Sequence, residues 1–220
     1  AGALQALADL MLLTGNFGSP GKGMILTNRH ANSTGICDLG AEPGYKPGRM
    51  PDESGLKPFV TEIRELFLSG KIKAALVFCE DPLENPSNLR FFRNLEFMAA
   101  VELFNTATTA VSKVVMPAST HIESGGSFTG SDRRIRRFAE IIPPLGGRTN
   151  LEIIKALASA MGGNIGIKNA DEAFRDIIKT NPLYGSINPD SQGETVWNPD
   201  AEAPNPEVLY SRLFAVSDGK

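Results

Sequence analysis

The chain is poor in cysteine and histidine and has no long apolar run. Among its 220 residues are 2 cysteines, Cys37 and Cys79, and 2 histidines, His30 and His121. Two cysteines so far apart form no disulfide framework and suit a reducing compartment, so we expect a cytoplasmic protein. The histidines do not lie at metal-ligand spacing with either cysteine, so no zinc signature is present. No apolar run approaches the length of a membrane span, so we expect no direct membrane insertion.

The chain also lacks an excess of basic residues. Its net charge is −3 and its pI is near 5.5, which argues against a nucleic-acid partner. No basic segment opens the sequence as in a signal peptide. Neither a Gly-x-Ser-x-Gly elbow nor a closely spaced cysteine set for an iron–sulfur cluster is found. The 41% hydrophobic content is enough for a real core, while Gly 22 and Pro 15 predict long ordered loops.

The apolar runs that are present predict an α/β fold. Three runs of strand length, Ile72–Phe78, Phe97–Leu103 and Val114–Met116, are separated by segments long enough for crossovers, the first of them a helix over Pro86–Asn94. This order is typical of a Rossmann-like parallel sheet with flanking helices, buried on both faces. Ligands of such sheets bind beyond the carboxyl ends of the strands, so the turn at 79–82 is the first candidate site.

The remaining elements follow from periodicity and from capping residues. We expect helices over Ala3–Leu13, Lys57–Ser69, Leu151–Met161 (capped by Asn150) and Asp171–Lys179, a helical turn over Thr106–Val111, loops over Thr14–Met50 and Asn181–Pro206, a short strand or hairpin arm ending at Phe138, and a strand over Val208–Val216. The first helix has almost no polar face, so we expect preceding sequence or a partner to cover it.

Three loop motifs allow more than one interpretation. The glycines from Gly15 to Gly23 could cradle a phosphate, or they could end a helix and form a turn. In the segment Cys79–Pro82, Glu80 and Asp81 could accept hydrogen bonds from a base or ribose, or the segment could be a polar turn. The arginines of Asp132–Arg137 could form a solvated face or bind phosphate, carboxylate or a protein interface.

Together, five segments resemble one family in the right order. They are Leu12–Gly23, Asn32–Gly40, Glu80–Asn88, Val114–Ala118 and Glu123–Arg137. They are similar to the family patterns LTGN-G-PG-G, NxQGxxDMG, GEDPLENDPN, DVVLPA and EKDGTFTNTERRVQR. The chain thus resembles the middle part of the large subunit of molybdopterin (bis-pterin guanine dinucleotide) oxidoreductases, above all formate dehydrogenases and the large iron–sulfur subunit of complex I.

The resemblance implies a cofactor site and a larger assembly. The cofactor would be molybdopterin guanine dinucleotide, with Mo or W and iron–sulfur clusters held by other segments or partners. The residues implied in binding it are Phe78, Cys79, Glu80, Asp81, Pro82, Glu102, Thr106, Thr108, Asn32 and Gly35. The implied partners are the rest of the large subunit or a sister subunit, together with iron–sulfur and flavin electron-transfer subunits.

The resemblance also implies a division of the chain. Residues 1–50 would end a preceding pterin-binding segment, 51–118 would form the Rossmann-like core, 119–148 would pack on an iron–sulfur domain, and 149–220 would complete the α/β unit.

Several positions depart from the family pattern. Asn28 stands in place of an arginine near the metal, and His30 in place of a glutamine. Thr34, Cys79 and Lys113 replace the family's glutamine, glycine and aspartate. These changes weaken formate chemistry or tight pterin binding.

Three functions follow from the sequence. The first, which the resemblance implies, is that the chain would be part of a molybdopterin-dependent, formate dehydrogenase-like oxidoreductase, not catalytic by itself. Alternatively, it belongs to a non-catalytic scaffold and electron-transfer subunit like the pterin-free large subunit of complex I. The third alternative is an unrelated nucleotide-binding α/β module.

Overall fold

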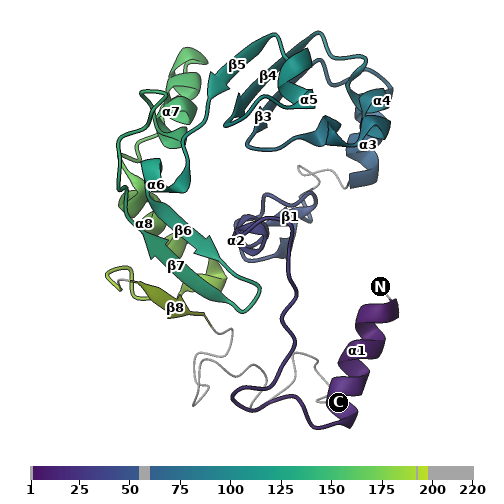
Figure 1. The fold of residues 1–220 in the computed structure, drawn as a ribbon, viewed down its shortest axis with the longest axis vertical. Coiled ribbons are helices and arrows are strands. Elements are labelled where there is room, and N and C mark those ends of the chain that lie inside the picture. Colours follow the sequence, from purple (N-terminus) through teal and green to yellow (C-terminus); the bar gives the residue numbers. More distant parts are fainter. Residues whose placement is uncertain (1, 55–59, 192, 198–220) are drawn as a thin grey trace.

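A computed structural model describes residues 2–54, 60–191 and 193–197. In Figure 1 most of the described elements follow an arc, with the parallel sheet toward one end and an antiparallel sheet at the other, while α1 (Gly2–Leu13) lies apart from the arc. Within the arc lie α2 (Ser33–Asp38) and the small β1–β2 ribbon (Tyr45–Lys46 and Met50–Pro51). The predicted strand over Val208–Val216 lies outside the described residues.

The predicted α/β architecture is confirmed. Three strands, β3 (Ala74–Phe78), β4 (Phe97–Glu102) and β5 (Val114–Pro117), form a parallel sheet in the order β3-β4-β5. The connections run through two 3₁₀ turns, η1 (Pro82–Glu84) and η2 (Pro86–Asn88), then α4 (Leu89–Phe92), and after β4 through α5 (Ala107–Val111). Register pairs such as Val77 with Ala100 and Ala100 with Val115 align the carboxyl ends of all three strands.

The prediction that this sheet is buried on both faces is wrong for its outer strands. The central strand supplies the core, with Val101 0% exposed, whereas Leu76 on β3 and Val115 on β5 are 48% and 49% exposed. These side chains are exposed because the described elements leave part of the faces of both outer strands uncovered. Val101 packs with Ala118 and with Ile153 of α7 (Asn150–Ala160), and Phe78 contacts this cluster.

The long loop predicted over Thr14–Met50 contains structure that the sequence reading missed. It holds α2 and the β1–β2 ribbon. α1 (Gly2–Leu13) ends as expected, because Gly15 takes a left-handed backbone (φ 65) and Asn16 N donates to Met11 O at 2.8 Å. The apolar side chains of α1 remain exposed among the described residues; Leu13, for example, is 85% exposed.

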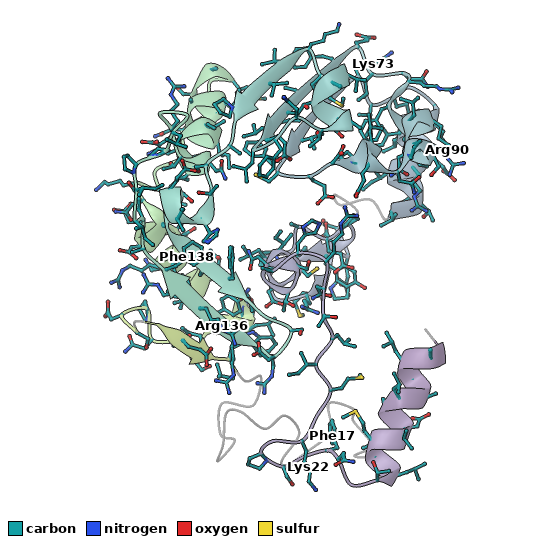
Figure 2. The ribbon with its side chains drawn as sticks, viewed as in Figure 1. Phe17, Lys22, Lys73, Arg90, Arg136 and Phe138 are labelled. Carbon is teal, nitrogen blue, oxygen red and sulfur yellow. The ribbon has the colours of Figure 1, made fainter. Side chains whose placement is uncertain are left out.

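The second sheet is antiparallel. β6 (Gly126–Thr129) and β7 (Arg134–Phe138) form the expected hairpin, on which Figure 2 shows Arg136 and Phe138. β8 (Glu194–Val196) pairs with β7, although the sequence predicted a loop there. The hydrophobic core beside this second sheet contains Ile135, Phe174 of α8 (Ala170–Thr180), Tyr184 of η3 (Pro182–Tyr184) and Trp197.

Two further short helices flank the strands of the parallel sheet in the sequence. α3 (Val60–Leu68) covers the described part of the helix predicted over Lys57–Ser69, and α6 (His121–Ser124) follows β5. None of the helices within the described ranges is long and apolar enough to cross a membrane.

Candidate functional site

The chain leaves β3 in an unusual backbone conformation. Cys79 has φ 48, a left-handed value that a residue with a side chain seldom adopts. Its N–H donates to Val101 O at 2.8 Å, so the hydrogen bonding of the sheet continues to this residue. Partial burial, and then the charge of Glu102, raise the pKa of the Cys79 thiol. The strand therefore ends at a fixed, strained position, as expected for a residue that occupies the place of a glycine.

Asp81 and Thr108 hold the turn to the start of α5. Asp81 Oδ1 accepts from Thr108 N at 3.0 Å and from Thr108 Oγ1 at 2.5 Å. Thr108 is fully buried, and its Oγ1 also accepts from Leu83 N at 3.2 Å. The hydroxyl of Thr108, followed by backbone N–H groups, lowers the pKa of Asp81. These two predicted site residues are brought together, but they bind each other.

Glu102 and Thr106 also have partners within the chain. Glu102 Oε1 accepts from Leu103 N at 2.6 Å. Thr106 caps α5, since its hydroxyl accepts from Thr109 N at 3.1 Å while Thr109 Oγ1 accepts from Thr106 N at 2.7 Å. Pro82 begins η1. Most of the residues predicted at this edge therefore shape the turn.

Glu80 and Glu84 reach a different part of the chain. His30 Nε2 lies 3.0 Å from Glu80 Oε2, and the two side chains are 49% and 44% exposed. Arg29 forms an ion pair with Glu84. The segment that precedes α2 is thus joined to the turn by two adjacent contacts.

The other two predicted residues, Asn32 and Gly35, lie by the hairpin. Asn32 Oδ1 accepts from Thr129 N at 2.9 Å. A Cβ on Gly35 would lie 2.3 Å from Asn32 Oδ1 and 3.2 Å from Thr129 Oγ1, so only glycine lets α2 pack this closely on β6. The structure therefore separates the predicted residues into a strand-end group and a hairpin group.

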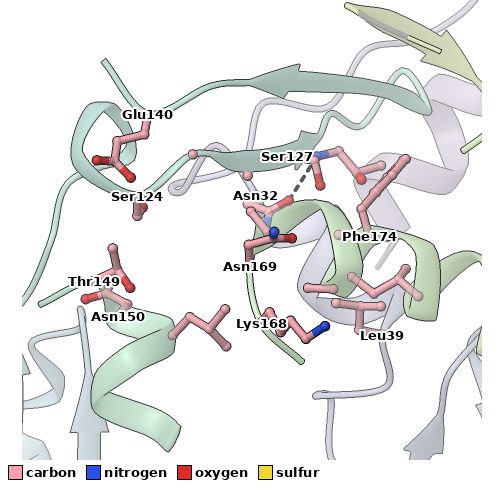
Figure 3. Close-up of a pocket in the computed structure, with 18 of the residues that line it drawn as sticks. Asn32, Leu39, Ser124, Ser127, Glu140, Thr149, Asn150, Lys168, Asn169 and Phe174 are labelled. Carbon is pink, nitrogen blue, oxygen red and sulfur yellow. Dashed lines mark hydrogen bonds between the residues drawn. The ribbon is translucent and has the colours of Figure 1, made fainter. Parts of the chain in front are cut away.

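Asn32 and Gly35 line a cavity of ≈ 500 Å³, drawn in Figure 3. Its walls come from α2, the α6–β6 junction and the first turns of α7 and α8. Polar groups on these walls include Ser124, Ser127, Glu140, Thr149, Asn150, Lys168 and Asn169. The sequence did not predict the cavity or a place in it for residues of α7 and α8, because these residues come together only through tertiary packing.

Asn150 connects the two groups. It lines the cavity, and its Nδ2 lies 3.9 Å from Cys79 Sγ. The predicted capping role of Asn150 is wrong: Thr149 caps α7 and forms a capping box with Glu152. The side chain of Asn150 is instead available to bind Ser119 and to contact Cys79.

A buried polar network adjoins the cavity through Thr129 and Tyr184, which line it. Asp38 is 0% exposed, accepts from Arg49 Nε at 2.6 Å and from Tyr184 Oη at 3.0 Å, and burial raises its pKa. Tyr184 Oη lies 3.0 Å from Thr129 Oγ1, and burial raises the pKa of this phenol. Asp38 belongs to the Asn32–Gly40 motif, so its position in the motif was the signal that could have identified it.

The remaining motifs have structural partners. Lys22 Nζ donates to Gly15 O at 2.7 Å across the glycine-rich loop, and Figure 2 shows Lys22 there. Arg136 pairs with Asp132 and Glu194 at 3.0 and 2.8 Å, which favours an ion-paired face over a free anion site. Within the described part of the chain, no group of three or more His, Cys, Asp or Glu residues could hold a metal ion.

Comparison with known proteins gives a consistent family signal. A family model described as molybdopterin oxidoreductase matches residues 1–160. The chain is 27% identical to a probable oxidoreductase, YjgC, of Bacillus subtilis (strain 168), with 98% of this chain and 24% of the relative covered. It is 30% identical to a candidate formate dehydrogenase of Staphylococcus aureus (strain bovine RF122 / ET3-1), over the same shares.

A solved structure gives a weaker likeness. Acetylene hydratase from Pelobacter acetylenicus aligns with a TM-score of 0.49 and 14% identity, over 76% of this chain and 25% of that chain. The chain thus spans about a quarter of the length of the curated relatives that it matches.

Proposed function

The chain belongs to the molybdopterin oxidoreductase family, and from this membership we propose that it is part of a molybdopterin-dependent, formate dehydrogenase-like oxidoreductase. Its own contribution is a half-site for the guanine dinucleotide of the cofactor. The observation that carries the proposal is that Asn150, which lines the ≈ 500 Å³ cavity, also contacts Cys79 of the strand-end turn, so an extended ligand could reach from one to the other past this residue.

The carboxylates at the turn fit a guanine base. Guanine presents N1–H and N2–H₂ side by side, and a carboxylate accepts from both. Asp81 is engaged by Thr108, and one oxygen of Glu102 by Leu103 N. Glu80 is a half-exposed carboxylate that, among the described residues, contacts the side chain of His30 from another segment. We therefore assign base recognition to Glu80.

The cavity fits the polar remainder of a dinucleotide. It offers backbone groups at Gly125 and Gly126, and the ammonium group of Lys168. The first turns of α7 and α8 both border it, and helix N-termini favour negative charge. Pyrophosphate and pterin are both polar groups, so this lining suits them.

The division of labour follows from the residues present. When bound, the cofactor and its metal supply two-electron chemistry, and the protein supplies binding and orientation. Glu80 would hold the base, and Asn150 would orient the ligand where the turn meets the cavity. We propose that the metal ligand and iron–sulfur clusters come from other segments or partners, and that flavin and iron–sulfur subunits complete the electron path.

The first experiment is the metal and pterin content of the native complex that contains this chain. We expect about one Mo or W and two pterins per complex, the content of a bis-pterin site. Elemental analysis and fluorescence of acid-released, oxidised pterin measure these. Iron without Mo, W or pterin would favour the alternative, a scaffold and electron-transfer subunit, a function to which the Cys79 side chain at the family's glycine position also points.

A further inference from the structure

The amino ends of the three parallel strands form an edge that the proposed cofactor site does not use. Lys73, Glu96 and Lys113 each directly precede one of these strands. Since β4 has six residues, this amino-end edge lies about 15–20 Å from the strand-end turn. Figure 2 shows Lys73 and Arg90 toward the outside of the arc, away from α2. An inference about this edge therefore does not depend on the proposed function.

An apolar groove lies at the amino-end edge. It has a volume of ≈ 120 Å³ and is lined by Leu89, Phe92, Leu95, Glu96, Phe97, Met98, Val111 and Lys113. Leu89, Phe97 and Val111 are partly open to the surface, with 44%, 43% and 54% exposure. An apolar patch with a polar rim is typical of a surface that contacts another protein.

Cationic side chains surround this groove. The segments 71–73, 89–97 and 111–114 line the groove or lead into the strands, and in sequence they carry one carboxylate, that of Glu96, against five exposed cations: Lys71, Lys73, Arg90, Arg93 and Lys113. The neighbouring helix α3, whose Phe67 packs on Phe92, adds two carboxylates and one guanidinium, those of Glu62, Glu65 and Arg64. The balance of the face stays positive, although the whole chain has a net charge of −3.

The carboxylate of Glu96 leaves much of this positive charge without a counterion. Glu96 Oε1 lies 3.0 Å from Lys73 Nζ, while Lys113 Nζ donates to the backbone oxygen of Glu96 at 2.7 Å. Within the described part of the chain, Lys71, Arg93 and Lys113 form no ion pair. These cations can therefore pair with carboxylates from outside the chain.

We propose that the amino-end edge binds an acidic segment of a partner protein, with an apolar side chain of that segment in the groove. The groove anchors the segment, and the cations steer its approach and set its register. An acidic protein segment matches both features, because it brings carboxylates and an apolar side chain together. A nucleic acid would match the cations but leave Leu89 and Val111 uncovered.

The first test cross-links the native complex that contains this chain with a carbodiimide. This reagent joins a lysine amine to a carboxylate that it contacts, without a spacer, and mass spectrometry of the digest identifies the joined peptides. We expect Lys113 or Lys71 to be joined to an aspartate or glutamate of another polypeptide. Lys179, an exposed lysine of α8, should stay unjoined. The Lys73–Glu96 pair within the chain is the positive control for the reaction.

The second test separates the charge from the apolar anchor. K113E should lower retention of the cross-linked partner by about two- to five-fold in low salt, and the difference should vanish near 1 M salt. K179E, the same charge change on α8, should retain the partner like wild type. V111S should lower retention at both salt concentrations, whereas I154S, at an exposed position of α7, should not.

Four results would overturn the proposal. One is the absence of cross-links from the lysines of the amino-end edge while the Lys73–Glu96 product forms. Another is a cross-link to a segment of the same polypeptide, which would make the edge an internal contact. Equal retention of the partner by wild type, K113E and V111S would show that the edge does not hold it. Nucleic acid that co-purifies with the wild-type complex and is lost from K113E would identify the other class of partner.

Discussion

Asn150 and Ser119 are joined by three hydrogen bonds that fix the first turn of α7 to the end of β5. Asn150 N donates to Ser119 Oγ at 2.9 Å, Asn150 Nδ2 donates to Ser119 O at 3.0 Å, and Ser119 N donates to Asn150 Oδ1 at 2.9 Å. Ser119 is buried, so its backbone groups depend on this side chain. The same Asn150 contacts Cys79 and lines the cavity, which makes the pair the link between sheet and site.

Asn150→Ala should therefore destabilise the chain more than Ser119→Ala. The first change leaves a buried N–H and C=O without partners and should cost about 1–3 kcal/mol of unfolding free energy. The second removes one acceptor and should cost about 0.5–1.5 kcal/mol. Urea unfolding of the two variants measures both values. Equal losses would show that the amide of Asn150 contributes nothing beyond the hydroxyl contact.

Thr108→Val should loosen the strand-end turn. Valine keeps the shape of threonine but removes the hydroxyl that binds Asp81 and accepts from Leu83 N, inside a fully buried site. We expect a loss of about 1–3 kcal/mol. Thr61→Val on the exposed surface of α3 is the matched control and should change stability by less than about 0.5 kcal/mol. A null result at position 108 would mean that the hydroxyl does not organise the turn.

The sequence was sufficient to predict the elements with strong local signals. The three parallel strands are continuous apolar runs, and α1 ends where Gly15 permits a left-handed backbone. α2 was missed because its six residues, Ser33–Asp38, are too short for a helical period and include a glycine. β8 was missed because its pairing with β7 spans some sixty residues and carries no local signal.

The candidate site was predictable only in part. The motif residues Glu80, Asp81, Thr108, Asn32 and Gly35 were predicted by resemblance, but the sequence did not show that Asp81 and Thr108 bind each other. Nor could it show that Asn150 faces Ser119 instead of capping α7, since threonine and asparagine are both good caps and stand side by side. The cavity depends on the relative placement of α2, β6, α7 and α8, which no spacing in the sequence records.

Asp81→Asn should reduce the dependence of stability on acid. The folded chain lowers the pKa of Asp81 through the Thr108 hydroxyl and backbone N–H groups. The unfolded state therefore binds the proton more tightly, so the stabilisation is present above about pH 4 and is lost as the pH falls through the folded-state value. Wild type should exceed the variant in stability at pH 7, and the difference should shrink by pH 3.

Urea unfolding across this pH range measures the effect, with Asp176→Asn on the exposed face of α8 as the control. A difference between wild type and Asp81→Asn that stays constant with pH would contradict the assignment.

Cys79→Gly should stabilise the chain although it removes a side chain. Cys79 has φ 48, and a left-handed backbone costs a residue with a Cβ about 1–2 kcal/mol. Glycine removes this strain, while its greater freedom in the unfolded state costs about 0.5–1 kcal/mol. The net result should be a gain of up to about 1.5 kcal/mol. Cys37→Gly within α2 is the matched control, and it should lose a few tenths of a kcal/mol because glycine is a poorer helix former than cysteine.

The same substitution tests whether the Cys79 side chain obstructs the proposed ligand. Without the Cβ, a ligand can approach the backbone of the turn more closely, so Cys79→Gly should bind GDP-mannose, a guanine nucleotide whose pyrophosphate is esterified at both ends, more tightly than wild type in calorimetry. Cys37→Gly lies away from the turn and should leave that affinity unchanged. A gain in stability without a gain in affinity would mean that the strain at Cys79 is structural and that the ligand does not approach this backbone. A loss of stability would show that the sulfur contact with Asn150 outweighs the strain, because removal of Sγ leaves Asn150 Nδ2 without this neighbour.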